Sequence, residues 1–224
     1  VMVPILYEDN HILVAVKPIG VLSQADGSDT PDMLTILKQY LKETYHKPFN
    51  VYLGLVHRLD KDVGGVMVFA KTSKAASRLS EQVRQHQMQK IYYAVVEGKM
   101  SGSGVLENHL VRETYRSRVC DGPSSKLARL YYQVLKSTSS SSLVKIKLDT
   151  GRHHQIRVQF AFISHPLLGD KKYGHGGKYP LALYAVSLGF YHPTKKEWLT
   201  FVHFPDREGY WRNFTMFDEN DLQF

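Results

Sequence analysis

The sequence predicts an α+β fold with a mixed, mainly antiparallel sheet, and three observations support this prediction. Short runs rich in apolar and β-branched residues recur along the 224 residues and predict strands. Helical patterns lie between them, but without the strict alternation of strand and helix that is typical of parallel sheets. Two of the runs, 130–135 and 143–148, flank the turn-forming residues 137–142 and therefore predict an antiparallel hairpin.

The first elements along the chain are a buried strand and a helix. The apolar run 12–16 predicts the strand, which ends at Lys17-Pro18. Thr30 supplies a capping hydroxyl and Pro31 a proline for the first turn, so we expect a helix to begin here. Its apolar face carries three leucines at helical spacing: Leu34, Leu37 and Leu41.

The middle of the chain repeats this arrangement. A strand is expected at 66–70, followed by a helix that Ser73 caps and then by a strand at 91–96. The apolar face of this second helix consists of Ala76, Leu79 and Val83.

In the later hairpin, apolar residues alternate with Lys145 and Lys147, which predicts a strand with one solvent-facing side. A helix at 154–163 and strands at 184–190 and 198–204 complete the pattern. The apolar stripe of this last helix consists of Ile156, Phe160 and Ile163.

The composition is that of a folded, basic protein. Hydrophobic residues make up 43% and aromatic residues 12% of the chain, which is enough to build a core. No apolar run approaches the roughly 20 residues that span a bilayer. Cys120 is the only cysteine, which excludes an internal disulfide and a thiolate-rich metal site and favours the reducing cytoplasm. We expect a cytoplasmic monomer that does not bind membranes.

The charge balance favours polyanionic partners. The 29 Lys and Arg residues against 21 Asp and Glu residues give a formal net charge of +8 and an isoelectric point near 9.4. Contacts between basic side chains and phosphates release condensed counterions, so a basic domain binds nucleic acid readily.

A first candidate for chemistry is the segment 54–65, Gly54-Leu55-Val56-His57-Arg58-Leu59-Asp60-Lys61-Asp62-Val63-Gly64-Gly65. Acidic and basic side chains are concentrated between an apolar lead-in and a glycine pair that permits a tight turn. Composition alone favours a charged surface loop that joins two strands, because short motifs often match by chance.

A second candidate is Thr150-Gly151-Arg152-His153-His154-Gln155-Ile156-Arg157, followed by His165-Pro166-Leu167-Leu168-Gly169-Asp170. Gly151 allows a turn from strand to helix, and the helix N-terminus could receive an anion. Alternatively, the arginines are solvated charges on a helix face. A metal site is disfavoured, because adjacent histidines on a helix point about 100° apart and no Cys or Glu stands at ligand spacing.

Taken together, these motifs resemble the RluA-type pseudouridine synthase family. The similarity runs in order through Asn10–Gly20, His57-Arg58-Leu59-Asp60 with Gly65, Lys90-Ile91-Tyr92, and the two histidine-containing segments just described. The resemblance covers nearly the whole chain. It implies a single catalytic domain over residues 1–224, without a separate N-terminal RNA-binding domain, and a sheet in two halves with flanking helices and a central active-site cleft.

The resemblance also implies residue roles. Asp60 matches the catalytic aspartate, Tyr92 the active-site tyrosine beside the base, and Arg157 the basic residue paired with the aspartate. Arg58 matches an arginine associated with displacing the target nucleotide from its stack. The family uses neither a metal nor an organic cofactor, so we expect none here.

Several positions depart from the family pattern. Val63-Gly64 stands where a Thr-Ser pair is usual, His153 replaces a Thr, and Tyr184 stands where a His is usual. Gln159 and Phe162 also replace residues that are often His. The loss of two hydroxyl groups after Asp60 bears on substrate choice and turnover more than on fold.

The chemistry that is implied suits these residues. A carboxylate could act as a nucleophile or abstract a sugar proton, and the sequence leaves both routes open. A nearby guanidinium would keep that carboxylate ionised, and Tyr92 offers a flat face for uracil.

RNA, in the form of a stem-loop of ribosomal or transfer RNA, is the expected partner. The contacts are expected from a basic stretch between Arg112 and Arg129, either a flexible arm or a solvated loop, and from the motif segments. The residues that we expect to contact RNA are His57, Arg58, Arg116, Arg118 and Arg152.

Two other functions are compatible with parts of the sequence. Asp60-Lys61-Asp62-Val63 has the form of the aspartate motif of magnesium-dependent phosphatases, but Gly169-Asp170 is followed by two lysines instead of further carboxylates. A non-catalytic RNA-binding relative is the other alternative. Retention of Asp60, Tyr92 and Arg157 together favours an enzyme.

Overall fold

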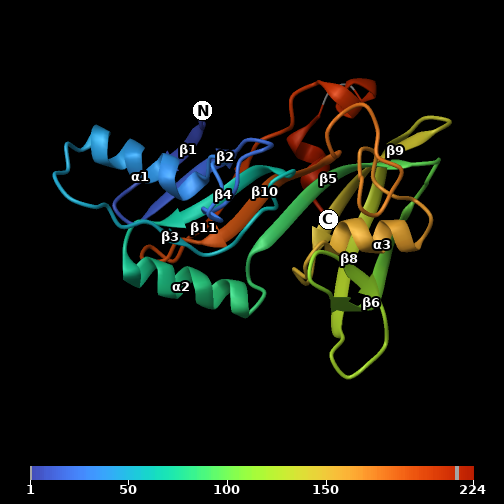
Figure 1. Cartoon of the computed structure of the whole chain (residues 1–224), viewed down its shortest axis with the longest axis horizontal. Coiled ribbons are helices and arrows are strands. Elements are labelled where there is room, and N and C mark those ends of the chain that lie inside the picture. Colours follow the sequence, from blue (N-terminus) through green and yellow to red (C-terminus); the bar gives the residue numbers. More distant parts are fainter. Residues whose placement is uncertain (1, 215–216) are drawn as a thin grey trace. The chain divides into compact units, whose positions relative to one another are not determined.

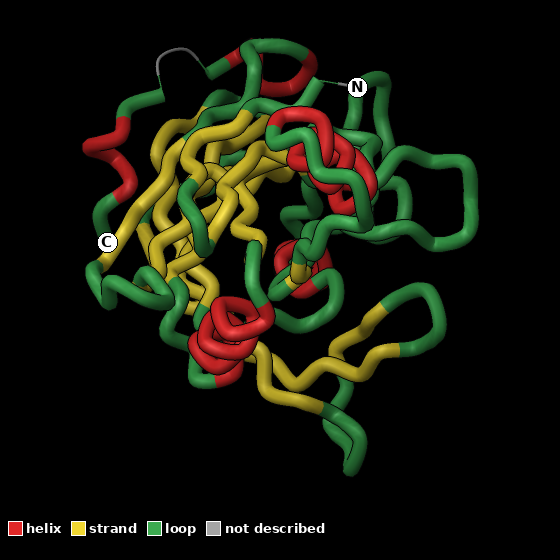
Figure 2. The backbone as a smooth tube through the Cα atoms, turned by 90° about the vertical axis from the view of Figure 1, so that its left-hand side faces the viewer, coloured by secondary structure: helices red, strands yellow, loops and turns green. Residues whose placement is uncertain are grey.

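The computed structural model describes residues 2–214 and 217–224, and it divides the chain into two compact units (Figure 1). Unit 1 comprises Val1–Gln89 and Ser187–His203, and unit 2 comprises Lys90–Val186 and Phe204–Phe224. Figure 2 shows that strands form most of the regular backbone in the described part of the chain. The strand pairings described below are antiparallel, which confirms the predicted fold class.

The sheet of unit 1 is built around two buried strands. β2 (Ile12–Lys17) pairs with β1 (Ile5–Glu8) on one side and with β4 (Gly64–Ala70) on the other. Every residue of β2 and β4 is buried, as expected for continuous apolar runs. The two-residue strand β3 (Gly54–Leu55) pairs with the end of β4 and leads into the segment that contains Asp60.

Unit 1 also contains the hairpin of β10 (Leu183–Tyr191) and β11 (Trp198–Val202). Residues 187–191 of β10 pair with β11 in this unit. The predicted strands at 184–190 and 198–204 are therefore confirmed, although β11 ends at Val202.

Both predicted helices of unit 1 form, but each has a different cap from the one expected. α1 (Met33–Thr44) begins after Asp32, whose carboxylate accepts the Thr35 N–H at 3.0 Å. α2 (Ser73–Arg84) begins after Thr72, whose hydroxyl accepts the Ala75 N–H at 3.1 Å. The predictions that Thr30 and Ser73 are the caps were wrong, because neighbouring side chains with equal capping ability lie at the true helix starts.

Unit 2 contains five neighbouring strands of the sheet, in the order β5-β9-β8-β6-β7. β5 (Gln89–Glu97), β8 (Lys126–Ser137) and β9 (Ser141–Leu148) contain the strands that the sequence predicts. β6 (Ser103–Arg112) and β7 (Ser117–Val119) were not predicted. The basic stretch 112–129 is therefore mostly β-structure and turn, where we expected a flexible arm or a loop.

Lys145 on β9 corrects the prediction of a solvent-facing side for this strand. Only 1% of its surface is exposed, and its Nζ donates to the carbonyl oxygens of Asp221 and Gln223. The C-terminal segment, with the short 3-10 helix η2 (Glu219–Leu222), therefore covers the side of β9 that alternation assigned to water. A second 3-10 helix, η1 (Gly209–Asn213), precedes it.

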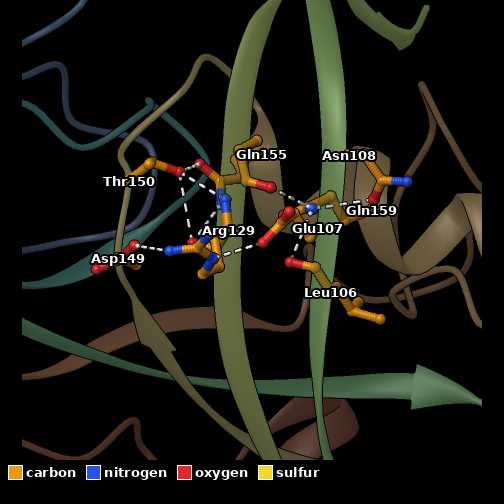
Figure 3. A network of polar contacts seen from close by, with 9 residues as sticks. Leu106, Glu107, Asn108, Arg129, Asp149, Thr150, Gln155 and Gln159 are labelled. Carbon is orange, nitrogen blue, oxygen red and sulfur yellow. Dashed lines mark hydrogen bonds and ion pairs between the residues drawn. The ribbon is translucent and has the colours of Figure 1, made fainter.

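The third helix, α3 (Gln155–Phe162), is attached to the sheet of unit 2 through two buried glutamines (Figure 3). Gln159 donates through Nε2 to the carbonyl oxygens of Leu106 and Ala128 and to Oδ1 of Asn108. Gln155 donates to the carbonyl of Arg129 and accepts from the hydroxyl of Thr150. These contacts place the face of α3 that carries the glutamines against β6 and β8. The helix is therefore buried on this face as well as along the predicted apolar stripe.

None of the helices in the described part of the chain combines the length and the apolar character needed to cross a bilayer.

Candidate active site

The segment that contains Asp60 is an exposed turn held by buried neighbours. The Asp60 carbonyl accepts the Val63 N–H at 3.0 Å, which closes a turn just before β4 begins. Leu59 and Val63 are buried on either side of the turn, whereas Asp60 itself is exposed. The fold therefore presents the carboxylate on an anchored loop.

Two side chains fix the start of this loop. The Ser23 hydroxyl donates to the Leu59 carbonyl at 2.7 Å and accepts the Leu59 N–H at 3.0 Å. His57 is 9% exposed, and its Nε2 accepts the Val68 N–H at 3.0 Å. This bond requires an unprotonated Nε2, so the proton of the neutral ring is on Nδ1. His57 thus supports the geometry of the loop, and its expected contact with RNA stays a prediction.

Lys17 is a component of the site that sequence reasoning treated only as the end of a strand. Its side chain is fully buried, and its Nζ donates to the carbonyl oxygens of Pro18, Val21 and Lys61. Lys61 directly follows Asp60, so the ammonium group ties strand β2 to the Asp60 turn. Burial lowers the pKa of Lys17 to about 8, against the opposing effect of the Asp60 and Asp62 carboxylates.

Replacing Lys17 with Met is expected to lower the free energy of unfolding by about 2 kcal/mol, because buried carbonyls lose their donors. Turnover is also expected to fall, since Lys61 loses one of its anchors. Denaturant titration of the purified variant measures the first effect. Lys38, an exposed lysine of α1, is the matched control, and Lys38→Met is expected to change stability by less than about 0.5 kcal/mol. Equal stability of the two variants would remove Lys17 from this role.

In unit 2, Arg157 is held by Asp170. Its Nε donates to Oδ2 at 2.9 Å and its NH2 group to Oδ1 at 2.8 Å, a two-pronged ion pair that fixes the plane of the guanidinium. Both side chains are buried, with 9% and 0% of their surfaces exposed. Asp170 belongs to the second candidate motif, but the sequence pattern alone does not indicate that it pairs with Arg157.

The Asp170 carboxyl is kept ionised by this environment. Burial raises its pKa, but hydrogen bonding and charge from Arg157 lower it, as do the backbone N–H groups of Lys172 and Tyr173. The net pKa lies below the ordinary value, so the ion pair persists at neutral pH.

Tyr92 lies on β5 opposite Ile146 of β9 and is buried, with 9% of its surface exposed. It therefore belongs to the same unit as Arg157, whereas Asp60 belongs to unit 1. The expected pairing of Asp60 with Arg157 stays a prediction.

His154, at the start of α3, is a half-buried base that is neutral near pH 7. It has a left-handed backbone conformation with φ of 54°, and its Nδ1 lies 2.7 Å from the Tyr173 hydroxyl oxygen. Burial, together with the positive charge of Arg157, lowers the pKa of His154 to about 3.

The free energy of unfolding is therefore expected to decrease as the pH is lowered below about 6.5. There the unfolded chain binds a proton at His154 that the folded chain does not bind until the pH is near 3. The slope is roughly 1.4 kcal/mol per pH unit at most for one proton. His154→Asn removes this titration and tolerates the left-handed backbone, so its unfolding free energy should fall less steeply between pH 6.5 and 4. Parallel curves for the two proteins would contradict the assignment.

The arginines expected to contact RNA differ in their surroundings. Arg58 is exposed beside Asp60. Arg152 donates to the Leu127 carbonyl on β8, Arg116 donates to the Lys172 carbonyl, and Arg118 is paired with Glu113 at 2.6 Å. Because Glu113 offsets the charge of Arg118, Arg116 and Arg152 carry more of the positive potential of this surface.

The structure thus brings Arg116, Arg152 and Arg157 into one unit, and His57, Arg58 and Asp60 onto one loop of the other. Among residues 2–214 and 217–224, His, Cys, Asp and Glu side chains form no group of three or more that could hold a metal ion.

Comparison with known proteins identifies relatives across this region. The family model for RNA pseudouridylate synthases matches residues 11–162, which include Asp60, Tyr92 and Arg157. Ribosomal large subunit pseudouridine synthase D of Yersinia pestis is 36% identical over 210 residues, covering 85% of this chain and 63% of the relative. An uncharacterized RNA pseudouridine synthase of Aquifex aeolicus is 37% identical over 213 residues, covering 88% of this chain and 67% of the relative.

Solved structures show the same fold. Human RNA pseudouridylate synthase domain containing 4 superimposes with a TM-score of 0.78 and 27% identity, covering 91% of this chain and 89% of that chain. The chain spans 63% of the length of the Yersinia relative, slightly less than two thirds.

Proposed function

Because the chain belongs to the RNA pseudouridylate synthase family, we propose that it converts uridine in structured RNA to pseudouridine, with Asp60 as the central catalytic residue. The observation that supports this proposal most strongly is the presentation of Asp60. Its carboxylate is exposed, while the turn that carries it is fastened by Lys17, Ser23 and His57. A reactive group held on a rigid support meets the geometric requirement for catalysis.

The reaction breaks the bond between the sugar and N1 of uracil, turns the base, and joins the sugar to C5. Asp60 either attacks the sugar as a nucleophile or abstracts a sugar proton, and both routes require an ionised carboxylate. In both, the detached uracil remains bound until the new carbon–carbon bond forms and the proton on C5 is lost.

Arg157 is proposed to keep the Asp60 carboxylate ionised when the substrate excludes water. A guanidinium has five N–H donors, and Asp170 accepts two of those of Arg157. The bidentate pair with Asp170 fixes the plane in which Arg157 presents its charge to a second carboxylate.

Tyr92 is proposed to lie against the uracil ring, and Arg58 to occupy the space that the flipped nucleotide leaves. Extruding a stacked base costs a few kcal/mol, which is least where pairing is already absent. An exposed guanidinium next to the catalytic residue is suitably placed for this role.

The substrate is proposed to be a uridine in a stem-loop of ribosomal or transfer RNA. The relatives named for the ribosomal large subunit favour ribosomal RNA. Proteins read RNA sequence mainly in loops and bulges, because the major groove of A-form RNA is too narrow for side chains. We further propose that the protein acts in the cytoplasm as a monomer and without a cofactor.

Incubating the purified protein with bulk cellular RNA tests this function. Digestion to nucleosides followed by chromatography should show uridine converted to pseudouridine, and the conversion should persist in EDTA. Loss of activity in EDTA together with phosphate release would favour the magnesium-dependent phosphatase. RNA binding without conversion would favour the non-catalytic relative.

The salt dependence of RNA binding is expected to depend on the basic stretch. Replacing Arg116 and Arg118 together with Gln should weaken binding and reduce the slope of log K against log salt by about 1, with catalysis at saturating RNA changed less. Arg116→Gln alone should account for most of this reduction, because Glu113 already neutralises Arg118.

The control for this experiment removes the same charge elsewhere, with Lys195→Gln and Lys196→Gln in the exposed turn between β10 and β11. An equal reduction of the slope in both double variants would mean that total charge, and not the basic stretch, governs binding.

A further inference from the structure

Strands β6 and β7 with the turn between them form a projecting hairpin, which we call the arm (residues 103–119). Its turn carries Tyr115, with 79% of its surface exposed, next to Arg116. The arm holds two of the arginines proposed to contact RNA. The contacts between the arm and the rest of unit 2 therefore determine how RNA binding to the arm affects the catalytic groups of this unit.

The end of the arm is attached by the segment 170–173 and by His153, whose Nδ1 lies 2.9 Å from the Ser117 hydroxyl oxygen. Arg116 donates to the Lys172 carbonyl at 3.2 Å, and the Lys172 ammonium group donates to the Tyr115 carbonyl. The Ser117 N–H donates to the Tyr173 hydroxyl at 2.8 Å. Each of these three hydrogen bonds with the segment joins a side chain to a backbone atom. Each therefore fixes the main chain of either the arm or the segment 170–173.

The Tyr173 hydroxyl connects the arm to α3. It accepts from Ser117 and lies 2.7 Å from Nδ1 of His154. Burial raises the pKa of Tyr173 and lowers that of His154, so the tyrosine keeps its proton and the imidazole is neutral. The hydroxyl therefore joins the Ser117 N–H to a neutral His154 ring, with the tautomer of the ring deciding which of the two side chains donates.

The ring and backbone of Tyr173 connect the same point to Arg157. The guanidinium carbons of Arg116 and Arg157 each lie 5.1 Å from the ring centroid, within range of cation–π attraction. The Tyr173 N–H also donates to Oδ1 of Asp170 at 3.1 Å, the oxygen that receives the NH2 group of Arg157. Tyr173 thus contacts the arm, the helix start, Arg157 and the partner of Arg157.

We propose that Tyr173 is a positioning residue that makes the orientation of Arg157 depend on the seating of the arm, so that RNA held by the arm favours the reactive arrangement. The inference rests on the proposed function. The competing explanation is that Tyr173 only fills space beside Leu110, Ala128 and Val158, against which its ring packs. A variant of residue 173 that keeps the aromatic ring but lacks the hydroxyl distinguishes the positioning role from the packing role.

Tyr173→Phe is the test, and Tyr210→Phe is the matched control. The Tyr210 hydroxyl also accepts a backbone N–H in unit 2, from Tyr179, and its ring packs edge to face against the ring of the same residue. Both variants keep an aromatic ring, so both are expected to fold. Thermal unfolding of each verifies this.

Three measurements distinguish positioning from packing. In Tyr173→Phe, amide exchange at Ser117 should accelerate about tenfold, because its acceptor is lost. The single-turnover rate constant at saturating RNA should fall about tenfold, as expected for a misplaced catalytic group, while the dissociation constant for RNA changes less than about threefold. Tyr210→Phe should match the wild type in all three.

A wild-type rate constant in Tyr173→Phe, alongside faster Ser117 exchange, would overturn the proposal, because the contact would then exist without affecting chemistry. Equal losses in the two variants would overturn it as well, because they would reflect general destabilisation. If the wild-type protein makes no pseudouridine, the proposed function fails and the inference fails with it. If the wild-type protein is active and Tyr173→Phe is equally active, only the inference about Tyr173 is rejected and the proposed function stands.

Discussion

Replacing Asp60 with Asn is expected to abolish uridine conversion while the protein still folds and binds RNA. The amide has the shape of the carboxylate but can neither attack the sugar nor accept its proton, so turnover should fall by at least about 10⁴-fold. Asp60 is exposed, so the free energy of unfolding should change by less than about 0.5 kcal/mol. Single-turnover assays and denaturant titration measure the two effects.

Asp62 provides the matched control, because it is an exposed carboxylate on the same turn. Asp62→Asn changes the charge of the loop by the same amount and should retain most of the activity. Comparable losses in the two variants would mean that the charge of the loop, and not one nucleophile or base, matters. Substantial turnover in Asp60→Asn would remove Asp60 from the central role.

Replacing Arg157 with Lys is expected to cause the second-largest loss of turnover. A point charge cannot reproduce the two parallel bonds to Asp170, so the cation would no longer be held in one plane. We expect a loss of about 10²- to 10³-fold in single-turnover rate, comparable to the removal of one preorganised donor. RNA affinity should change much less.

Asp170→Asn tests the same ion pair from the other side. It leaves a buried guanidinium without its anionic partner, which should lower the free energy of unfolding by about 3–5 kcal/mol. Arg84→Lys is the control for the arginine substitution, because Arg84 forms an exposed pair with Glu81 at the end of α2. An Arg157→Lys variant as active as Arg84→Lys would contradict the proposed role of the guanidinium.

Much of the fold could be predicted because local pattern and tertiary environment agree there. β2 and β4 are continuous apolar runs, and both are buried throughout. Strand β6 was not predicted, because polar residues such as Glu107, Asn108 and His109 stand at its half-buried positions as well as at its exposed ones. β6 pairs with residues of β8, and pairing between two separate strands is not visible in a local sequence pattern.

The same distinction separates the predicted and unpredicted parts of the candidate site. Asp60, Tyr92 and Arg157 are found by motif, because the resemblance is carried by short contiguous segments. Their supports come from elsewhere in the chain: the bond from Lys17 to the carbonyl of Lys61 joins residues 44 positions apart. Lys145 was assigned to solvent for a related reason, since the segment that covers it lies more than 70 residues further along.

Isomerisation of uridine through Asp60 can be tested by a map of pseudouridine in RNA from cells that lack the gene. We expect specific uridines in stem-loops of ribosomal or transfer RNA to lose the modification. Expression of the wild-type protein should restore those sites, and Asp60→Asn at the same protein level should restore none. Restoration by Asp60→Asn, or an unchanged map in the absence of the gene, would contradict the claim.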